Sequence, residues 1–189
     1  MVNWWAKGLS APDLATLGTL GSVLPALRVL TLAERSAGPD GVQRLAEGLV
    51  TGALPAVTWL GLIGMHVGDA GALELAAALG RGALPRLKTL FLANAAIGDA
   101  ALVALAPALQ RRPALEQLFL SENPFGDEGL VALVAPPPLA GALPLPTGGL
   151  KKLVRLHLGY RTPRSPTRDA PRWPLRSTAA RCLRSSTSS

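Results

Sequence analysis

Few residues of this chain are arranged as a catalytic site would need. Its two histidines are His66, in a predicted turn, and His157, on a predicted strand about three structural units later, so they are poorly placed to act together. The sequence lacks the HExxH, GxxxxGK[ST], GxSxG and GxGxxG motifs of proteases, phosphate-binding loops, hydrolases and dinucleotide sites. Asp127 and Glu128 are adjacent carboxylates, but they open a predicted helix, where a structural role is favoured. We therefore predict no catalytic residues and no enzymatic activity.

Three aspartates recur where predicted helices begin: Asp69, Asp99 and Asp127. A row of carboxylates could bind a metal ion. However, their spacing follows the period of the whole chain, which favours helix capping and a favourable interaction with the helix dipole. A single cysteine, Cys182, excludes an internal disulfide framework and a cysteine-based zinc site. We predict no metal ion and no cofactor.

The elements that carry these residues are predicted by a recurring pattern of leucines. An apolar pattern of the form L-x-x-L-x-L starts at residues 27, 57, 87, 115 and 153. A turn glycine follows in each of the first four units, and then a stretch whose apolar residues recur at i, i+3 and often i+7; these glycines are Gly38, Gly68, Gly98 and Gly126. A period of two that gives way to 3.6 indicates a strand followed by a helix. Such units bury their apolar faces only by stacking, which predicts a parallel sheet covered on one side by helices.

This pattern resembles the leucine-rich repeats of the ribonuclease-inhibitor type, most strongly over residues 87–109 and 115–133. The resemblance covers about residues 14–160. It implies an α/β solenoid in a curved arc, with parallel strands on the concave face, helices on the convex face, and four clear repeats plus partial ones. The family favours Asn at the ninth place of each unit, which here holds Arg35, Met65, Ala95, Asn123 and Arg161. In the family, this asparagine bonds to backbone groups between successive coils. We therefore expect these bonds to be largely absent here and the edge of the solenoid to be looser than in the family.

The predicted domain spans residues 1–160, with a Pro/Gly-rich insertion at 135–149 and a disordered Arg/Ser/Pro-rich tail at 161–189. Leu14, Leu17 and Leu20 are interpreted as the helix of a unit whose strand is missing. Because solenoids need polar caps at both ends, we interpret the chain as a fragment of a longer repeat protein, or as one degenerate at both ends.

Positive charge is concentrated in the tail. Residues 1–160 carry twelve Lys and Arg against eleven Asp and Glu, whereas residues 161–189 carry seven Arg against one Asp. The tail could bind nucleic acid or anionic lipid, tunable by phosphorylation at Ser165, but a solvated tail without a partner is favoured. Prolines exclude a membrane-spanning helix over 129–150, and no signal peptide is evident. We expect a soluble, intracellular and cytoplasmic protein without membrane contact.

The face that the strands turn away from the core is predicted to bind a partner. The third and fifth places of each leucine pattern point outward, and three of the eight aromatic residues of the chain occupy them: Trp59, Phe91 and Phe119. Around them we predict three contact residues that set specificity, Gln117, Glu122 and Arg155, and one further contact residue, His157. The alternative is that the aromatic side chains only stack on one another and stabilise the sheet.

These observations predict a non-enzymatic protein–protein interaction module whose partner is not identified. The resemblance leaves open a second class, a regulator similar to Ran GTPase-activating proteins, which carry the same repeat type. That class needs specific polar residues at the rim of the sheet, and they are not matched in this sequence. Nucleic-acid binding through the tail is the third alternative.

Overall fold

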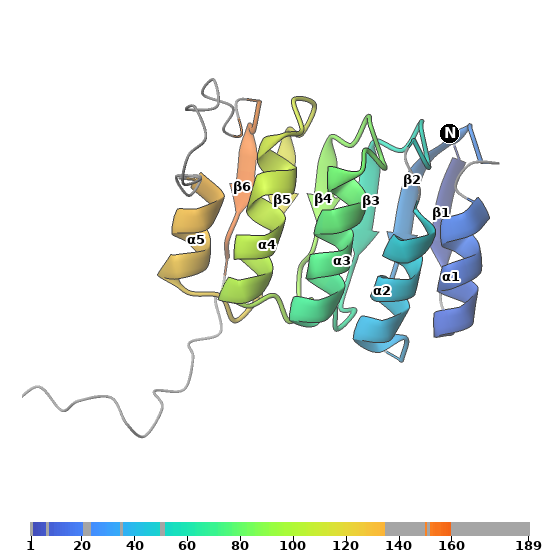
Figure 1. Ribbon diagram of the computed structural model, residues 1–189, viewed down its shortest axis with the longest axis horizontal. Coiled ribbons are helices and arrows are strands. Elements are labelled where there is room, and N and C mark those ends of the chain that lie inside the picture. The colour runs from blue at the N-terminus through green and yellow to red at the C-terminus, as the bar shows by residue number, and fades with distance from the viewer. Residues whose placement is uncertain are drawn as a thin grey trace, which may run out of the picture.

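Parallel strands and helices alternate along the chain in the computed structural model (Figure 1). The structure describes residues 2–6 by their backbone, and residues 8–20, 24–34, 36–49, 52–134, 150 and 152–159 with their side chains. The predicted insertion at 135–149, the predicted tail at 161–189 and Cys182 lie outside the described residues.

Six strands and five helices make up the described part of the chain. The strands are β1 (Val2–Ala6), β2 (Leu27–Leu32), β3 (Trp59–Leu62), β4 (Thr89–Phe91), β5 (Gln117–Phe119) and β6 (Arg155–His157). The helices are α1 (Ala11–Thr19), α2 (Gly38–Gly48), α3 (Gly68–Gly80), α4 (Asp99–Gln110) and α5 (Asp127–Val134). A helix needs about 20 apolar residues to cross a membrane, and none of these described helices is long and apolar enough.

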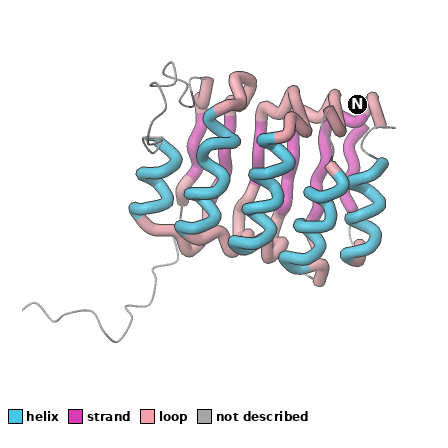
Figure 2. Tube along the Cα trace, in the orientation of Figure 1, coloured by secondary structure: helices cyan, strands magenta, loops and turns pink. Residues whose placement is uncertain are grey.

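The strands form one open sheet in chain order, from β1 to β6, and every neighbouring pair is parallel. The sheet is neither closed nor curled. All five helices lie on the same side of it, packed side by side in one layer (Figures 1 and 2). The predicted parallel α/β architecture is therefore confirmed, and one face of the sheet carries none of the described helices. We call it the helix-free face.

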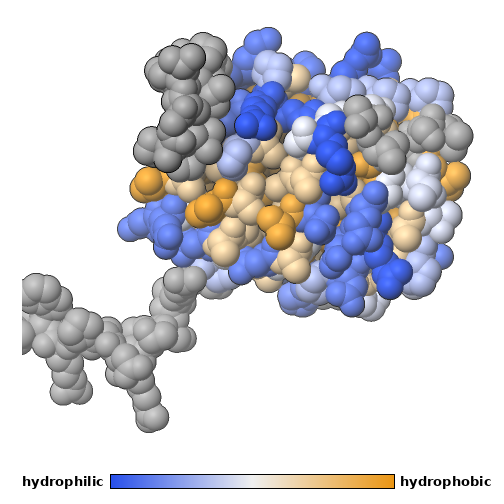
Figure 3. Space-filling view, viewed as in Figure 1, coloured by the Kyte–Doolittle hydropathy of each residue, from blue (hydrophilic) through white to orange (hydrophobic). Residues whose placement is uncertain are grey.

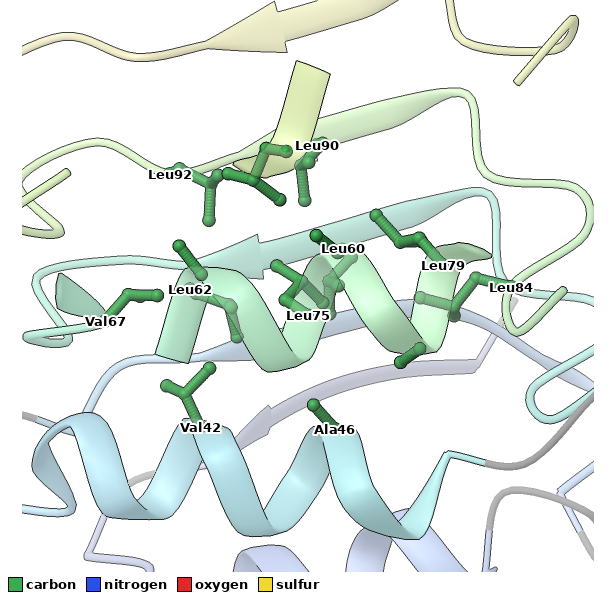
Figure 4. Packing of buried hydrophobic residues seen from close by; sticks show 14 of the residues in the cluster. Val42, Ala46, Leu60, Leu62, Val67, Leu75, Leu79, Leu84, Leu90 and Leu92 are labelled. Carbon is green, nitrogen blue, oxygen red and sulfur yellow. The ribbon is translucent and has the colours of Figure 1, made fainter. Parts of the chain in front are cut away.

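The repeated leucines form the core between the two layers. The strand register aligns one leucine from each unit, and in β2 to β5 these side chains are at most 1% exposed; they are Leu30, Leu60, Leu90 and Leu118. Side chains of α2 and α3 meet them from the helix layer (Figure 4). Each fully buried leucine contributes about 2 kcal/mol relative to an exposed one. Stacking of the units is thus the main source of stability.

The N-terminal residues correct one expectation from the sequence. β1 pairs in parallel with β2, so the prediction that the first unit lacks its strand is wrong. Its sequence, VNWWA, is rich in residues that favour strands but lacks the leucine pattern. In α1, Leu14 and Leu17 are buried as expected, whereas Leu20 follows the helix and is 43% exposed. The first unit therefore holds a strand and a helix like the others.

Candidate partner-binding face

Two rows of outward side chains cross the helix-free face at right angles to the strands. The strand register places Trp59, Thr89, Gln117 and Arg155 in the first row. The second row, two residues further along each strand, holds Gly61, Phe91, Phe119 and His157. Six of the seven predicted contact residues thus lie in adjacent positions on one surface.

Four aromatic rings from these rows form one connected group, in which Phe91, Phe119 and His157 stack in series. The ring centroid of Trp59 lies 6.3 Å from that of Phe91, with an angle of 22° between the planes, and 6.4 Å from that of Phe119, so Trp59 lies beside both phenylalanines. The next two distances are shorter: 4.8 Å from Phe91 to Phe119, and 4.3 Å from Phe119 to His157, where the planes differ by only 7°. We call these four side chains the ring stack. The predicted alternative of mutual stacking is therefore present, and it is compatible with a binding surface.

A glycine allows Trp59 to join the stack from the neighbouring row. Trp59 stands in the first row, beside Thr89, while its stacking partner Phe91 stands in the second row, opposite Gly61. A Cβ atom on Gly61 would lie 3.4 Å from the indole Nε1 of Trp59 and 3.4 Å from Cγ2 of Thr31. The indole thus leans over the position where other residues would carry a side chain. This role of Gly61 was not predicted, although the sequence places a glycine in the second row next to a tryptophan in the first.

The ring stack is half-buried along its length and ends in an exposed residue. Trp59, Phe91 and Phe119 are each partly accessible, and His157 is exposed on β6, the last described strand. Phe119 has a ring on each side, so the part of it that faces solvent is chiefly its edge. Ring edges carry partial positive charge and attract oxygen acceptors. The stack therefore offers apolar area together with weak donors of fixed direction.

The other predicted polar contact residues lie on β5, on β6 and in the turn after β5. Gln117 is half-buried on β5, and its register partner Arg155 is exposed on β6. Glu122 lies in the turn after β5, with φ at 59°, and its backbone N–H donates to the Gly159 carbonyl at 3.1 Å. Lys88 and Glu116 form an exposed ion pair at 2.9 Å just before β4 and β5, which contributes less than about 1 kcal/mol.

The structure does not bring catalytic or metal-binding groups together in the part of the chain that it describes. His66 is exposed in the turn before α3, and His157 lies on β6. No group of three His, Cys, Asp or Glu residues that could hold a metal ion occurs among the described residues. The predictions of no catalytic residue and no metal ion stay predictions.

Two of the recurring aspartates, Asp69 and Asp99, bond to the neighbouring unit. Asp69 stands in the first turn of α3, yet its Oδ1 accepts a hydrogen bond from the backbone N–H of Ala101 in α4 at 3.1 Å. Asp99 of α4 likewise accepts from Gly126 and Gly129, at the start of α5, at 2.6 and 3.0 Å. These carboxylates therefore cap the following helix. Helix capping was predicted from the sequence, but not which helix each carboxylate caps.

Arginines make the corresponding contacts at the other end of the helix layer. Arg112 follows α4 and donates to the carbonyls of Leu84 and Leu79 in the preceding unit. Arg81 follows α3 and donates to the Ala46 carbonyl of α2 at 3.3 Å. Partial burial lowers the pKa of Arg112 from its ordinary value. Positive charge at helix C-termini is favourable, so both ends of the helix layer are joined by charged hydrogen bonds.

Asn123 occupies the ninth place of its unit and is completely buried. Its Oδ1 accepts from the backbone N–H groups of Ala95 and Ile97, both at 3.0 Å. Its Nδ2 donates to the carbonyls of Leu92, Leu120 and Ser121 at 2.7, 2.9 and 3.2 Å. One side chain thus joins the turns of two units. It also satisfies the backbone beside Ala95, where the preceding unit lacks an asparagine.

Comparison with known proteins adds no identification. No protein-family model and no curated protein matches this chain. The fold and the surface described above are therefore the basis for a functional proposal.

Proposed function

We propose that the chain is a leucine-rich-repeat solenoid of the ribonuclease-inhibitor type, shallow in its arc, with the helix-free face as its concave side. Support comes from the parallel units of strand and helix, the aligned leucines and the buried Asn123 at the ninth place. The inter-unit hydrogen bonds of Asp69 and Asp99 add to this support, because they join units of one repeating geometry.

We further propose that this domain is a non-enzymatic module that binds a protein partner on the helix-free face. The observation that carries the proposal is the ring stack, four aromatic side chains that remain partly accessible on a face without helices. Aromatic residues at the centre of a surface, with polar residues around them, are typical of protein interfaces. Gln117 and Arg155 supply such polar groups beside the rings.

The chemistry of the surface indicates what the partner presents. The ring edges attract oxygen acceptors, and the exposed Arg155 guanidinium at the β6 end binds carboxylates in a two-point geometry. We expect a partner segment whose apolar side chains lie against the rings and whose carbonyl or carboxylate oxygens meet their edges and Arg155. The GTPase-activating and nucleic-acid-binding alternatives stay predictions, since no observation on the described residues favours them.

The test compares partners captured by the full chain and by two variants of it. The first replaces Phe91 and Phe119 with Leu, which keeps apolar volume but removes the stacked rings. The matched control replaces Gln43 and Arg44 of α2 with Ala, on the helix layer at the opposite side of the molecule. A protein retained by the wild type and the control but lost by the ring variant supports the proposal, provided circular dichroism shows all three folded.

Two results would contradict this function. If the ring variant captures the same proteins as the wild type with equal recovery, the rings are not part of a binding surface. If it unfolds at a much lower temperature while recovery of partners at low temperature is unchanged, the stack serves packing alone.

A further inference from the structure

The helix layer carries a second apolar surface, on the side of the molecule opposite the ring stack. Three large apolar side chains there are strongly exposed: Leu73 at 57%, Val103 at 42% and Val131 at 59%. Each lies five residues after the turn glycine of its unit, so they occupy equivalent positions on α3, α4 and α5. They form a row across three adjacent helices, and Val134 of α5 adds to it at 64% exposure. We call this row and the helix surface around it the apolar helix face.

The helices under this row carry few of the polar residues that a solvent-facing helix usually has, and beyond its first turn α3 has one charged residue, Glu74, next to Leu73. α4 has the sequence DAALVALAPALQ, with no charged residue after Asp99. In α2, by contrast, the position equivalent to Val103 is Gln43, and Arg44 and Glu47 lie beside it. The space-filling view agrees: apolar colour crosses the middle of the helix layer, and hydrophilic residues border it (Figure 3). An apolar patch limited to three helices indicates contact with another surface.

Opposite charges border the apolar helix face at its two ends. The helix N-termini carry exposed acidic residues, among them Asp69 on α3 and Glu128 on α5. The C-terminal ends are followed by the exposed arginines Arg81, Arg86 and Arg111. The face therefore has an acidic border at α3 and α5, an apolar middle, and a basic border at α3 and α4, in that order along the helix direction.

A surface with this order of charges is complementary to itself. We propose that the occupant of the apolar helix face is a second copy of this chain, related by a two-fold axis that runs along the row of Leu73, Val103 and Val131. This axis places the helices of the two copies antiparallel, with each row against its equal. The acidic border of each copy then faces the basic border of the other. An axis parallel to the helices would instead place acidic residues against acidic residues, which is unfavourable.

The size of the face predicts a weak dimer. Helices α3, α4 and α5 lie about 10 Å apart and are about 20, 18 and 12 Å long, so together they cover roughly 500 Å². A stable interface buries about 800 Å² on each partner, so the charged borders must contribute as well. We therefore expect a monomer–dimer equilibrium that depends on protein concentration and that added salt shifts towards the monomer.

Sedimentation equilibrium of the full chain tests the existence of this dimer. Val103→Arg places two positive charges near the symmetry axis, and we expect the dissociation constant to rise about tenfold or more. Gln43→Arg introduces the same residue at the equivalent position of α2, beside Glu47 and outside the row. This control should change the dissociation constant little. A wild type that stays monomeric at every soluble concentration overturns the proposal and leaves a different protein as the occupant. Equal effects of the two variants overturn it as well.

A cysteine placed in the row tests the symmetry. In a Cys182→Ser background, Leu73→Cys should form a disulfide-linked dimer on mild oxidation, because the axis brings each residue 73 close to its equal. The control variant is Lys88→Cys. Lys88 lies just before β4, outside the helix layer, so this variant should not form a cross-link. A dimer without the Leu73→Cys cross-link rejects the antiparallel arrangement. The ring stack is on the opposite side of the molecule, so either result leaves the proposed partner-binding function unaffected.

Discussion

Phe119 on β5 and His157 on β6 stack face to face, with ring centroids 4.3 Å apart and planes only 7° from parallel. Phe119 also contacts Phe91 at 4.8 Å, so that its ring has an aromatic neighbour on each side. β6 is the edge strand of the described sheet, and its three residues offer few backbone hydrogen bonds. The stacked pair therefore helps to hold this strand on the sheet.

A double-mutant cycle on this pair measures the contribution of stacking. Phe119→Leu retains apolar burial but removes the ring, and His157→Ala removes the outer ring. We expect a coupling energy of about 0.5–1.5 kcal/mol between the two substitutions, as for other aromatic pairs. Urea unfolding of the four proteins gives this value. A coupling close to zero would mean that the two rings are neighbours without a stabilising interaction.

We expect the loss of the Asn123 side chain to reduce stability much more than the loss of the Phe119–His157 stacking. Its side chain makes five hydrogen bonds to backbone groups of two units from a fully buried position. Asn123→Ala leaves these groups without partners, and each buried polar group without a partner costs about 1–3 kcal/mol, so we expect a loss of at least about 3 kcal/mol.

Hydrogen exchange locates this effect within the molecule. In Asn123→Ala, the amides of Ala95 and Ile97 should exchange much faster, because they lose their acceptor. Ser121→Ala serves as the control, since it alters a neighbouring half-buried side chain but keeps the carbonyl that Asn123 contacts. Unchanged protection of Ala95 and Ile97 in Asn123→Ala would contradict the role assigned to this side chain.

The strands and their buried side chains could be predicted from the sequence because the leucine spacing has one structural meaning. Leu60, Leu90 and Leu118 fall at the centres of β3, β4 and β5 and are buried as expected. β1 was missed because its run of Val and Trp residues carries a strand preference but not the leucine pattern. The ring positions on the helix-free face followed from the same alternation, which also fixes which side chains point outward.

Contacts between units could not be predicted in the same way. A carboxylate at a helix start has the same sequence signature whether it caps its own helix or the next one. The hydrogen bond from the Ala101 N–H to Asp69 could therefore not be predicted. The apolar helix face was missed for a similar reason. Leu73 and Val103 lie next to buried apolar residues in helices where almost every position is apolar, so the periodicity does not separate inner from outer positions.

The aspartates predict a graded series of stabilities. Asp99 accepts two backbone hydrogen bonds from the unit that follows, and Asp69 accepts one. We expect Asp99→Ala to cost about 2 kcal/mol and Asp69→Ala about 1 kcal/mol. Asp40→Ala, in the first turn of α2, should lose only the interaction with the helix dipole, about 0.5 kcal/mol. Chemical unfolding checks the order, and equal losses at all three positions would argue against capping between units.

We expect acid to weaken the hydrogen bonds that Glu34 accepts from Ser36 and from Gly8 of the first unit. Hydrogen bonds from Ser36, by its side chain and its backbone, and from the backbone N–H of Gly8 hold the pKa of this carboxyl below its ordinary value of 4.5. The unfolded chain therefore binds more protons than the folded protein when the pH falls below about 4.5. The stabilisation is complete above that pH and is lost as the pH falls through the lower pKa of the folded state.

Glu34→Gln isolates this contribution, because glutamine keeps the shape of the side chain but not its charge. At pH 7 the variant should melt at a lower temperature than the wild type, and the difference should shrink as the pH falls below about 4.5, where the wild-type carboxyl is also protonated. The carboxyl of Asp13, whose pKa Ser10 lowers in the same way, is present in both proteins and so cancels in the comparison. Thermal melts by circular dichroism at pH 7, 4.5 and 3 supply the measurement. A difference that stays constant with pH would show that Glu34 acts through packing, since only the loss of its charge depends on pH.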